Sequence, residues 1–240
     1  MCDWRINMEV VYNPEKNQCS VVLIGDFNPL MFQPEWFKRN GIISPEEVDI
    51  AENNKTSPMV ISNQITMFKT SQFDIRIEQK RFQVVAEKEP FIVLKDFVIK
   101  TFEKLGGLII TAVGYNYSAH YNIGDKSKYQ LIGDRLAPKK YWNDLLGDEV
   151  TGTDRKSGLM SITMQKNMEN DKGHLSMILQ PSAVVNTGVF LSCNDHINFK
   201  DDDSIADNVM ETIDTLFELS FDKMKNLQQN LLIEVLKEDD

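Results

Sequence analysis

The chain has few of the residues on which common catalytic and membrane functions depend. Its 240 residues include three cysteines and three histidines. Cys2, Cys19 and Cys193 are too widely spaced for a disulfide framework or a zinc-ligand pattern, so we interpret them as reduced structural thiols. No apolar run approaches the length of a membrane span, and the N-terminus lacks the pattern of a secretory signal. The sequence therefore predicts a cytoplasmic protein without membrane contact.

Positive charge is also scarce. Lys and Arg number 26 against 36 Asp and Glu, which leaves a formal net charge of -10. Sequence-independent binding to DNA or RNA needs clustered cations against phosphate, so a nucleic-acid partner is not favoured. The densest basic group, between Lys126 and Lys140, has acidic residues interspersed, and we interpret it as a solvated helical surface.

Motifs for nucleophilic or nucleotide chemistry are missing from the sequence. No Gly-x-Ser-x-Gly turn, phosphate-binding loop or dinucleotide fingerprint occurs. Ser118 and His120 are neighbours on one face of a predicted strand, whereas Cys193 and His196 fall on opposite faces of another. The sequence thus predicts no cofactor, and it leaves open whether the protein is an enzyme.

What the chain does have is strict two-residue alternation in two stretches, 108–125 and 189–201. This period is typical of a strand with one apolar and one polar face. In both stretches the apolar face carries Val, Ile, Leu, Tyr or Cys, and the polar face carries Asn, Ser and His. The polar side chains are our candidates for a binding surface or a ligand site: Asn116, Ser118, His120, Asn122, Asn194, His196 and Asn198.

The two stretches also align with each other without a gap. His120 falls on His196 and Asp125 on Asp201. We interpret the match as a sign of internal duplication. A shared strand-to-helix edge and a chance match of polar alternation remain as alternatives.

A metal site is the best catalytic hypothesis. If the two strands are neighbours, His120, His196, Asp125 and Asp201 could converge, and imidazoles with carboxylates suit zinc, manganese or iron. The alternative is that each His is a polar residue on a half-exposed sheet face and each Asp caps the element that follows. We favour this second interpretation, so no metal ligand is assigned.

The order of predicted elements indicates an α+β fold, with antiparallel sheets from two pseudo-duplicated halves packed against helices. Strands are predicted at 5–13 and 20–24 with a turn between them, and helices near 91–105 and 204–236. The Gly-rich stretch 147–156 divides residues 1–146 from 157–240, although both could form one compact domain. Two short helices at 127–146 should point Trp142 and Leu145 inward. The long C-terminal helix should use Leu231 and Val235 for a contact beyond its own half or with a partner.

Several motifs recur in a known group of proteins. The first runs from Gly25-Asp26-Phe27-Asn28-Pro29 through Phe32, Pro34, Trp36-Phe37 and Gly41-Ile42-Ile43. Others are Gly114-Tyr115-Asn116 to His120, Gly133 to Pro138 with Trp142, and Asn194-Asp195-His196. Together they resemble a sporadically distributed family of uncharacterised bacterial proteins. The resemblance implies a bacterial or phage-related, soluble, full-length domain, and it implies no particular activity, substrate or cofactor.

These observations predict a non-enzymatic binding or assembly subunit of a bacterial cytoplasmic multi-protein system, with a protein partner or self-association. Proteins of such sporadic families often work in multi-gene systems, including defence against phage. The alternative is a metal-dependent hydrolase that uses the two His-x-Asn strands.

Overall fold

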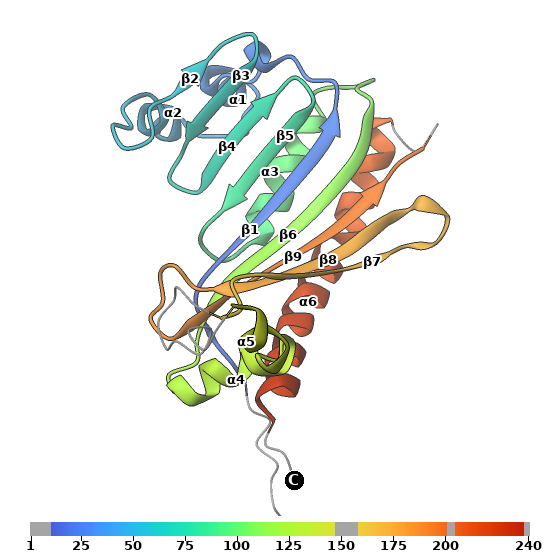
Figure 1. Ribbon diagram of the computed structural model, residues 1–240. Coiled ribbons are helices and arrows are strands. Elements are labelled where there is room, and N and C mark those ends of the chain that lie inside the picture. The colour runs from blue at the N-terminus through green and yellow to red at the C-terminus, as the bar shows by residue number, and fades with distance from the viewer. Residues whose placement is uncertain (1–10, 147–157, 201–204, 238–240) are drawn as a thin grey trace, which may run out of the picture.

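The computed structural model describes residues 11–146, 158–200 and 205–237, and its strands form one antiparallel sheet (Figure 1). Across the sheet the strand order is β2-β3-β4-β5-β1-β6-β9-β8-β7. The strands are β1 (Pro14–Gly25), β2 (Val60–Ile61), β3 (Ile65–Lys69), β4 (Phe73–Glu78), β5 (Arg81–Ala86), β6 (Ile110–Asn122), β7 (Ile162–Asn167), β8 (Gly173–Pro181) and β9 (Gly188–Asn198).

Helices connect and cover these strands. They are η1 (Pro29–Met31), α1 (Pro34–Arg39), α2 (Pro45–Glu52), α3 (Ile92–Phe102), α4 (Lys126–Leu136), α5 (Lys140–Leu146), η3 (Glu169–Asp171) and α6 (Ala206–Leu236). The predicted α+β class, with an antiparallel sheet and a long C-terminal helix, is confirmed. None of the helices within the described ranges is both long enough and apolar enough to cross a membrane.

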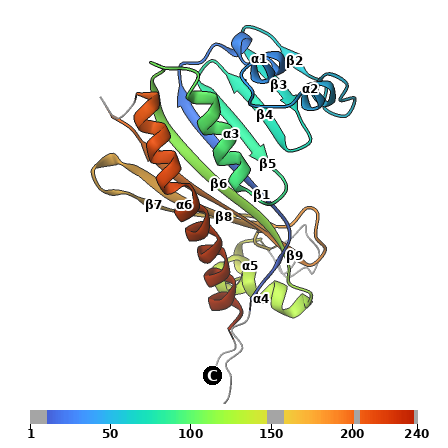
Figure 2. The same ribbon diagram turned by 180° about the vertical axis from the view of Figure 1, so that it is seen from behind.

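The main helices pack on one side of the sheet. Seen from behind, α3 and α6 lie next to each other across the central strands, and they contact each other (Figure 2). η1 and α2 pack against β3, while α4 packs against α6. The apolar residues of each strand face this helical layer, including Val21 on β1, Val84 on β5 and Tyr115 on β6, all fully buried. The opposite side of the central strands is the open face of the sheet.

Aromatic side chains fill the core around α3. Phe32 and Phe37, from the proline-containing loop and α1, are fully buried. The ring of Phe37 stacks on Phe97 of α3 at 5.3 Å between centroids, and Phe32 meets Phe82 of β5 edge-on at 5.4 Å. The aromatic residues of this stretch therefore serve to fill the core.

The order of elements repeats once along the chain. The first repeat is β1, a helical insert (η1, α1, α2), then β3, β4, β5 and α3; the second is β6, a helical insert (α4, α5), then β7, β8, β9 and α6. In each repeat the first strand pairs with the last, β1 with β5 and β6 with β9. The pairing of β1 with β6 joins the repeats into one sheet, and β2 adds an edge strand to the first.

The repeat differs from the one expected from the sequence. The stretches 108–125 and 189–201 contribute β6 and β9, which are antiparallel partners within the second repeat and not equivalent strands. Their matching alternation arises because neighbouring strands share both faces of one sheet. The repeats therefore divide after α3, whereas the division expected at 147–156 falls outside the described residues, and one sheet includes strands from both sides of it.

The start of the chain also differs from expectation. Residues 14–17, predicted as a turn, belong to β1, and Pro14 pairs with Tyr121 ahead of a register shift. Proline is tolerated at the first position of a strand, because its missing N–H does not interrupt the backbone hydrogen bonds of the residues that follow. Of the predicted strand at 5–13, residues 5–10 lie outside the described part.

The C-terminal helix makes the expected contact beyond its own half, because α4 lies within residues 1–146, whereas α5 requires a correction. The buried stripe of α6 turns toward Gln228 and Leu232, so Leu231 is half-buried and Val235 is buried within the chain. The final turns pack on α4, whose Arg135 donates to the Val235 carbonyl at 2.8 Å. Trp142 and Leu145, expected to point inward, are 48% and 76% exposed, because α5 buries none of its residues.

Candidate functional site on the open face

The structure brings the seven candidate polar residues together on the open face. β6 and β9 are adjacent, and their register places Asn116 opposite Asn194 and Gly114 opposite His196. Partners in an antiparallel pair point to the same side, so all seven side chains share one surface. On this surface the strands β6 to β9 present only Gly, Ala and uncharged polar or apolar side chains, among them Ser176, Gln180 and Thr163.

Hydrogen bonds between side chains connect neighbouring strands across this face. Ser118 and Ser192 share a bond of 2.8 Å between their hydroxyl oxygens. One row further along, Asn194 Nδ2 donates to Asn116 Oδ1, also at 2.8 Å. These cross-strand pairs orient the amide and hydroxyl groups, which reduces the conformational entropy that a bound partner would have to remove.

The corresponding part of the first repeat has a different character. β3, β4 and β5 carry charged groups on the open face, and two of them form the ion pair between Arg76 and Glu78 at 2.6 Å. Lys69 pairs with Glu87 at 2.8 Å. The open face is thus divided into a charged region over the first repeat and an uncharged polar region over the second.

Two histidines stack at the outer end of the polar region. His174 of β8 lies opposite His196 of β9, with ring centroids 4.8 Å apart and planes 24° from parallel. His196 Nε2 is 3.0 Å from Asn198 Oδ1, whose own amide donates to the Asp171 carbonyl. Burial lowers the pKa of His196 and nearby His174 lowers it further, while the hydrogen bond to Asn198 acts in the opposite direction.

His120 occupies the other end, where a hydroxyl fixes its tautomer. Its Nδ1 lies 2.9 Å from Ser182 Oγ, which already accepts from the backbone amides of Val184 and Val185. The Ser182 proton therefore points at Nδ1, and the ring carries its own proton on Nε2. Burial, assisted by Lys16, lowers the pKa of His120, so the imidazole is neutral at neutral pH.

A shallow pocket of about 460 Å³ opens beside His120. Its floor is Ser118 and His120, and one wall is formed by Phe190, whose ring is 4.8 Å from the imidazole. β1 supplies the other wall with a mixture of charges and amides: Glu15, Lys16, Asn17 and Gln18. This pocket is a concave feature at the border between the uncharged polar region and the charged residues of β1.

The hypothetical metal ligands do not converge. His120 lies opposite Phe190 and His196 opposite Gly114, which is six residues away along β6, or about 20 Å at the usual rise. Asp125 caps α4 by accepting from the amides of Ser127 and Lys128, which lowers its pKa. Asp201 lies outside the described residues. In the part of the chain that the structure describes, no group of three or more His, Cys, Asp or Glu side chains could hold a metal ion.

Ser182 and the two cysteines of the described residues are buried in structural roles. Ser182 is fully buried and its hydroxyl orders the turn that follows β8. Cys193 points to the helical layer, where burial raises its thiol pKa to about 11. Burial raises the pKa of Cys19 as well. Thiols held in their neutral form by burial are poor nucleophiles.

Two polar residues of the helical side were missed by the sequence patterns. Asp195, on the apolar side of β9, is 3% exposed and accepts from Ser220 Oγ at 3.0 Å and Lys223 Nζ at 3.1 Å. Gln228 sits in the buried stripe of α6 and hydrogen-bonds both β6 and β9. A signal existed for Asp195, because it is a carboxylate at an apolar position of the alternation. Both residues are structural and lie on the side away from the open face.

Comparison of the chain with protein-family models and with curated proteins finds no match to either. The family resemblance therefore remains a prediction from motifs.

Proposed function

We propose that the protein is a non-enzymatic binding subunit that receives a protein partner on the uncharged polar region of its open face. The observation that supports this most is the row of hydrogen-bonded side chains on β6 and β9, with Ser118–Ser192 and Asn116–Asn194 pairs. Such a surface offers oriented donors and acceptors without charges that would need to be desolvated.

A protein partner fits this surface better than a nucleic acid. The uncharged region provides hydroxyl, amide and neutral imidazole groups, with Phe190 as an aromatic contact. A phosphate backbone would need cations there, and the positions of β6 to β9 on the open face carry none. By analogy with other proteins of sporadically distributed families, we propose that the protein works in a bacterial cytoplasmic multi-protein system, of which phage defence is one example.

The test is affinity purification of the tagged protein from cells that produce it naturally. Ser176→Arg places a cation in the middle of the polar region, on β8 opposite Asn194. Gln72→Arg also replaces an uncharged polar residue by a cation, but at an exposed turn position away from the polar region, and it serves as the matched control. We expect a stoichiometric protein partner with the wild type and the control, and its loss with Ser176→Arg. Recovery of the wild type as a lone chain, or equal capture by all three proteins, would contradict the proposal.

A further inference from the structure

The two repeats differ in how their outer strands are covered on the helical side. In the first repeat the insert after β1 folds back over the outer strands, with η1 and α2 against β3. Phe37 of α1 contacts Phe68 of β3 at 5.7 Å between ring centroids, and Phe68 is buried. The outer strand β3 of this repeat therefore lies beneath helical cover.

The second repeat lacks that cover within the described ranges. α6 packs on β6 and β9, and the hairpin of β7 and β8 projects past it (Figure 2). Met164 of β7 faces the helical side opposite Met177, yet it is 67% exposed. Leu175 and Met177 of β8 are only half-buried. An apolar strip of the sheet is thus open to solvent beside α6.

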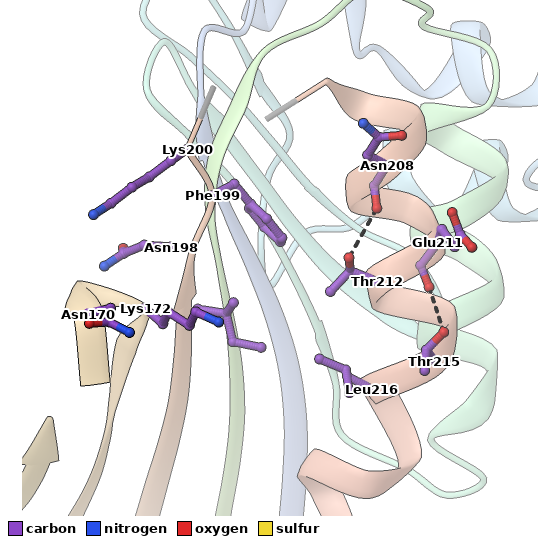
Figure 3. Close-up of a pocket in the computed structure, with 11 residues that line it drawn as sticks. Asn170, Lys172, Asn198, Phe199, Lys200, Asn208, Glu211, Thr212, Thr215 and Leu216 are labelled. Atoms are coloured by element: carbon purple, nitrogen blue, oxygen red, sulfur yellow. Dashed lines mark hydrogen bonds between the residues drawn. The ribbon is translucent and has the colours of Figure 1, made fainter. Parts of the chain in front are cut away.

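A groove of about 730 Å³ lies between the end of β9 with the neighbouring η3 turn and the N-terminal half of α6 (Figure 3). Ile197, Phe199 and Leu216 provide its apolar lining, and Phe199 points across it toward the helix. Leu219, one turn beyond Thr215 on the same face of α6, is 64% exposed. The rim carries Lys172 and Lys200 on the strand side and Glu211 on the helix side, and the side chains of Lys200 and Glu211 point away from each other (Figure 3).

The insert of the second repeat carries a matching apolar surface. α5 holds the place in the chain order that α2 holds in the first repeat. Four of its seven residues are large, apolar and about half exposed or more: Tyr141, Trp142, Leu145 and Leu146. Lys140 and Asp144 on the same helix add one charge of each sign.

We propose that α5 of a second copy of this chain occupies the groove, and that two copies exchange their α5 helices. The apolar side chains of α5 cover Phe199, Leu216 and Leu219, and Asp144 approaches the lysines of the rim. Each copy thereby gains the helical cover that the first repeat makes for itself. This groove shares only Asn198 with the candidate residues of the open face, so the inference does not depend on the proposed function.

The chain cannot place its own α5 there. Arg135 holds α4 at the Val235 and Lys237 carbonyls, at the C-terminal end of α6. The groove lies near Thr212, more than twenty residues earlier, which is about 30 Å along the helix. Three residues join α4 to α5, and they span at most about 14 Å. A second copy is therefore the only source of this helix that the geometry allows.

The first measurement is the mass in solution at about 100 µM, where associations of micromolar affinity are populated. Wild type should be a dimer by light scattering. Trp142→Glu with Leu145→Glu on α5, and separately Leu219→Glu on the groove wall, should each give a monomer. Ile50→Glu, at a comparably exposed apolar position on α2, is the control and should remain a dimer. A monomeric wild type would overturn the proposal.

The second measurement locates the contact by disulfide cross-linking in a Cys2→Ser background. Leu145→Cys and Thr215→Cys are made in separate proteins, mixed and oxidised gently. A covalent dimer of one protein with the other is expected, because the two positions meet only between copies. A mixture of Leu145→Cys with Gln72→Cys is the control and should stay unlinked. If the Thr215→Cys mixture also stays unlinked, or if the control links equally well, α5 does not occupy the groove.

Discussion

Gln228 is the polar side chain whose removal should report most clearly on how α6 is held to the sheet. It is fully buried, its Nε2 donates to the carbonyls of Tyr117 at 3.1 Å and Leu191 at 3.4 Å, and its Oε1 accepts from Tyr121 Oη at 2.9 Å. Gln228→Leu keeps the size of the side chain but deletes all three bonds. Each of the three lost hydrogen bonds costs about 1 kcal/mol, with a range of about 0.5–1.5 kcal/mol. We therefore expect the free energy of unfolding to fall by about 2–4 kcal/mol.

Urea denaturation followed by circular dichroism measures this loss, and a double-mutant cycle with Tyr121→Phe isolates the bond between the two side chains. The coupling should be about 1 kcal/mol, because the Leu variant loses less once the hydroxyl is gone. Asn226→Leu, on the exposed side of the same helix, is the control and should change stability by less than about 0.5 kcal/mol. A Gln228→Leu protein as stable as the control would show that the buried network does not hold α6 in place.

Three other predictions follow from burial. Phe221→Ala should lower the free energy of unfolding by about 3–5 kcal/mol in the same assay, because the Phe221 ring is 4% exposed and contacts Phe217 and Tyr115. A loss below about 1 kcal/mol would place Phe221 outside the core. Because burial lowers the pKa of His120, its imidazole should titrate below the unfolded value of about 6.5 in an NMR titration. Above the unfolded pKa the neutral His120 ring stabilises the fold, and this contribution is lost as the pH falls through the folded pKa. His120→Gln should therefore flatten the decline of the free energy of unfolding below about pH 7. An unchanged decline in the variant would refute the assignment. Deleting residues 230–240 removes the buried Leu232, Val235 and Leu236, so the melting temperature should fall, and an unchanged melting temperature would refute the packing of α6 on α4.

Local patterns predicted the elements and their faces well. Alternation around Asn116 and Asn194 identified two strands and placed their polar residues on the side that the structure leaves open. Helix signals were equally direct, since Ser44 caps α2 and Asp125 caps α4 as the capping rules anticipate. Strand faces and helix caps depend on residues that are close in sequence, so the spacing of apolar and polar residues is enough to predict them.

Long-range pairing could not be obtained in this way. The match of His120 with His196 suggested equivalent strands, but the same alternation occurs in strands that lie side by side. Gln228 belongs to the buried stripe of α6 although glutamine is usually an exposed residue, and only the hydrogen-bond partners that the folded core supplies explain its burial. Trp142 and Leu145 were expected inside because of their apolarity, and only the packing of neighbouring elements could show that α5 projects.

The measurement that bears most directly on the proposed function is the affinity of the purified protein for the partner it captures, determined by titration calorimetry. Ser176→Arg should weaken binding by tenfold or more, which corresponds to about 1.4 kcal/mol, because the new cation would be desolvated against an uncharged surface. The Gln72→Arg control should bind as the wild type does. If all three proteins bind the partner with the same affinity, the uncharged polar region of the open face is not the binding surface.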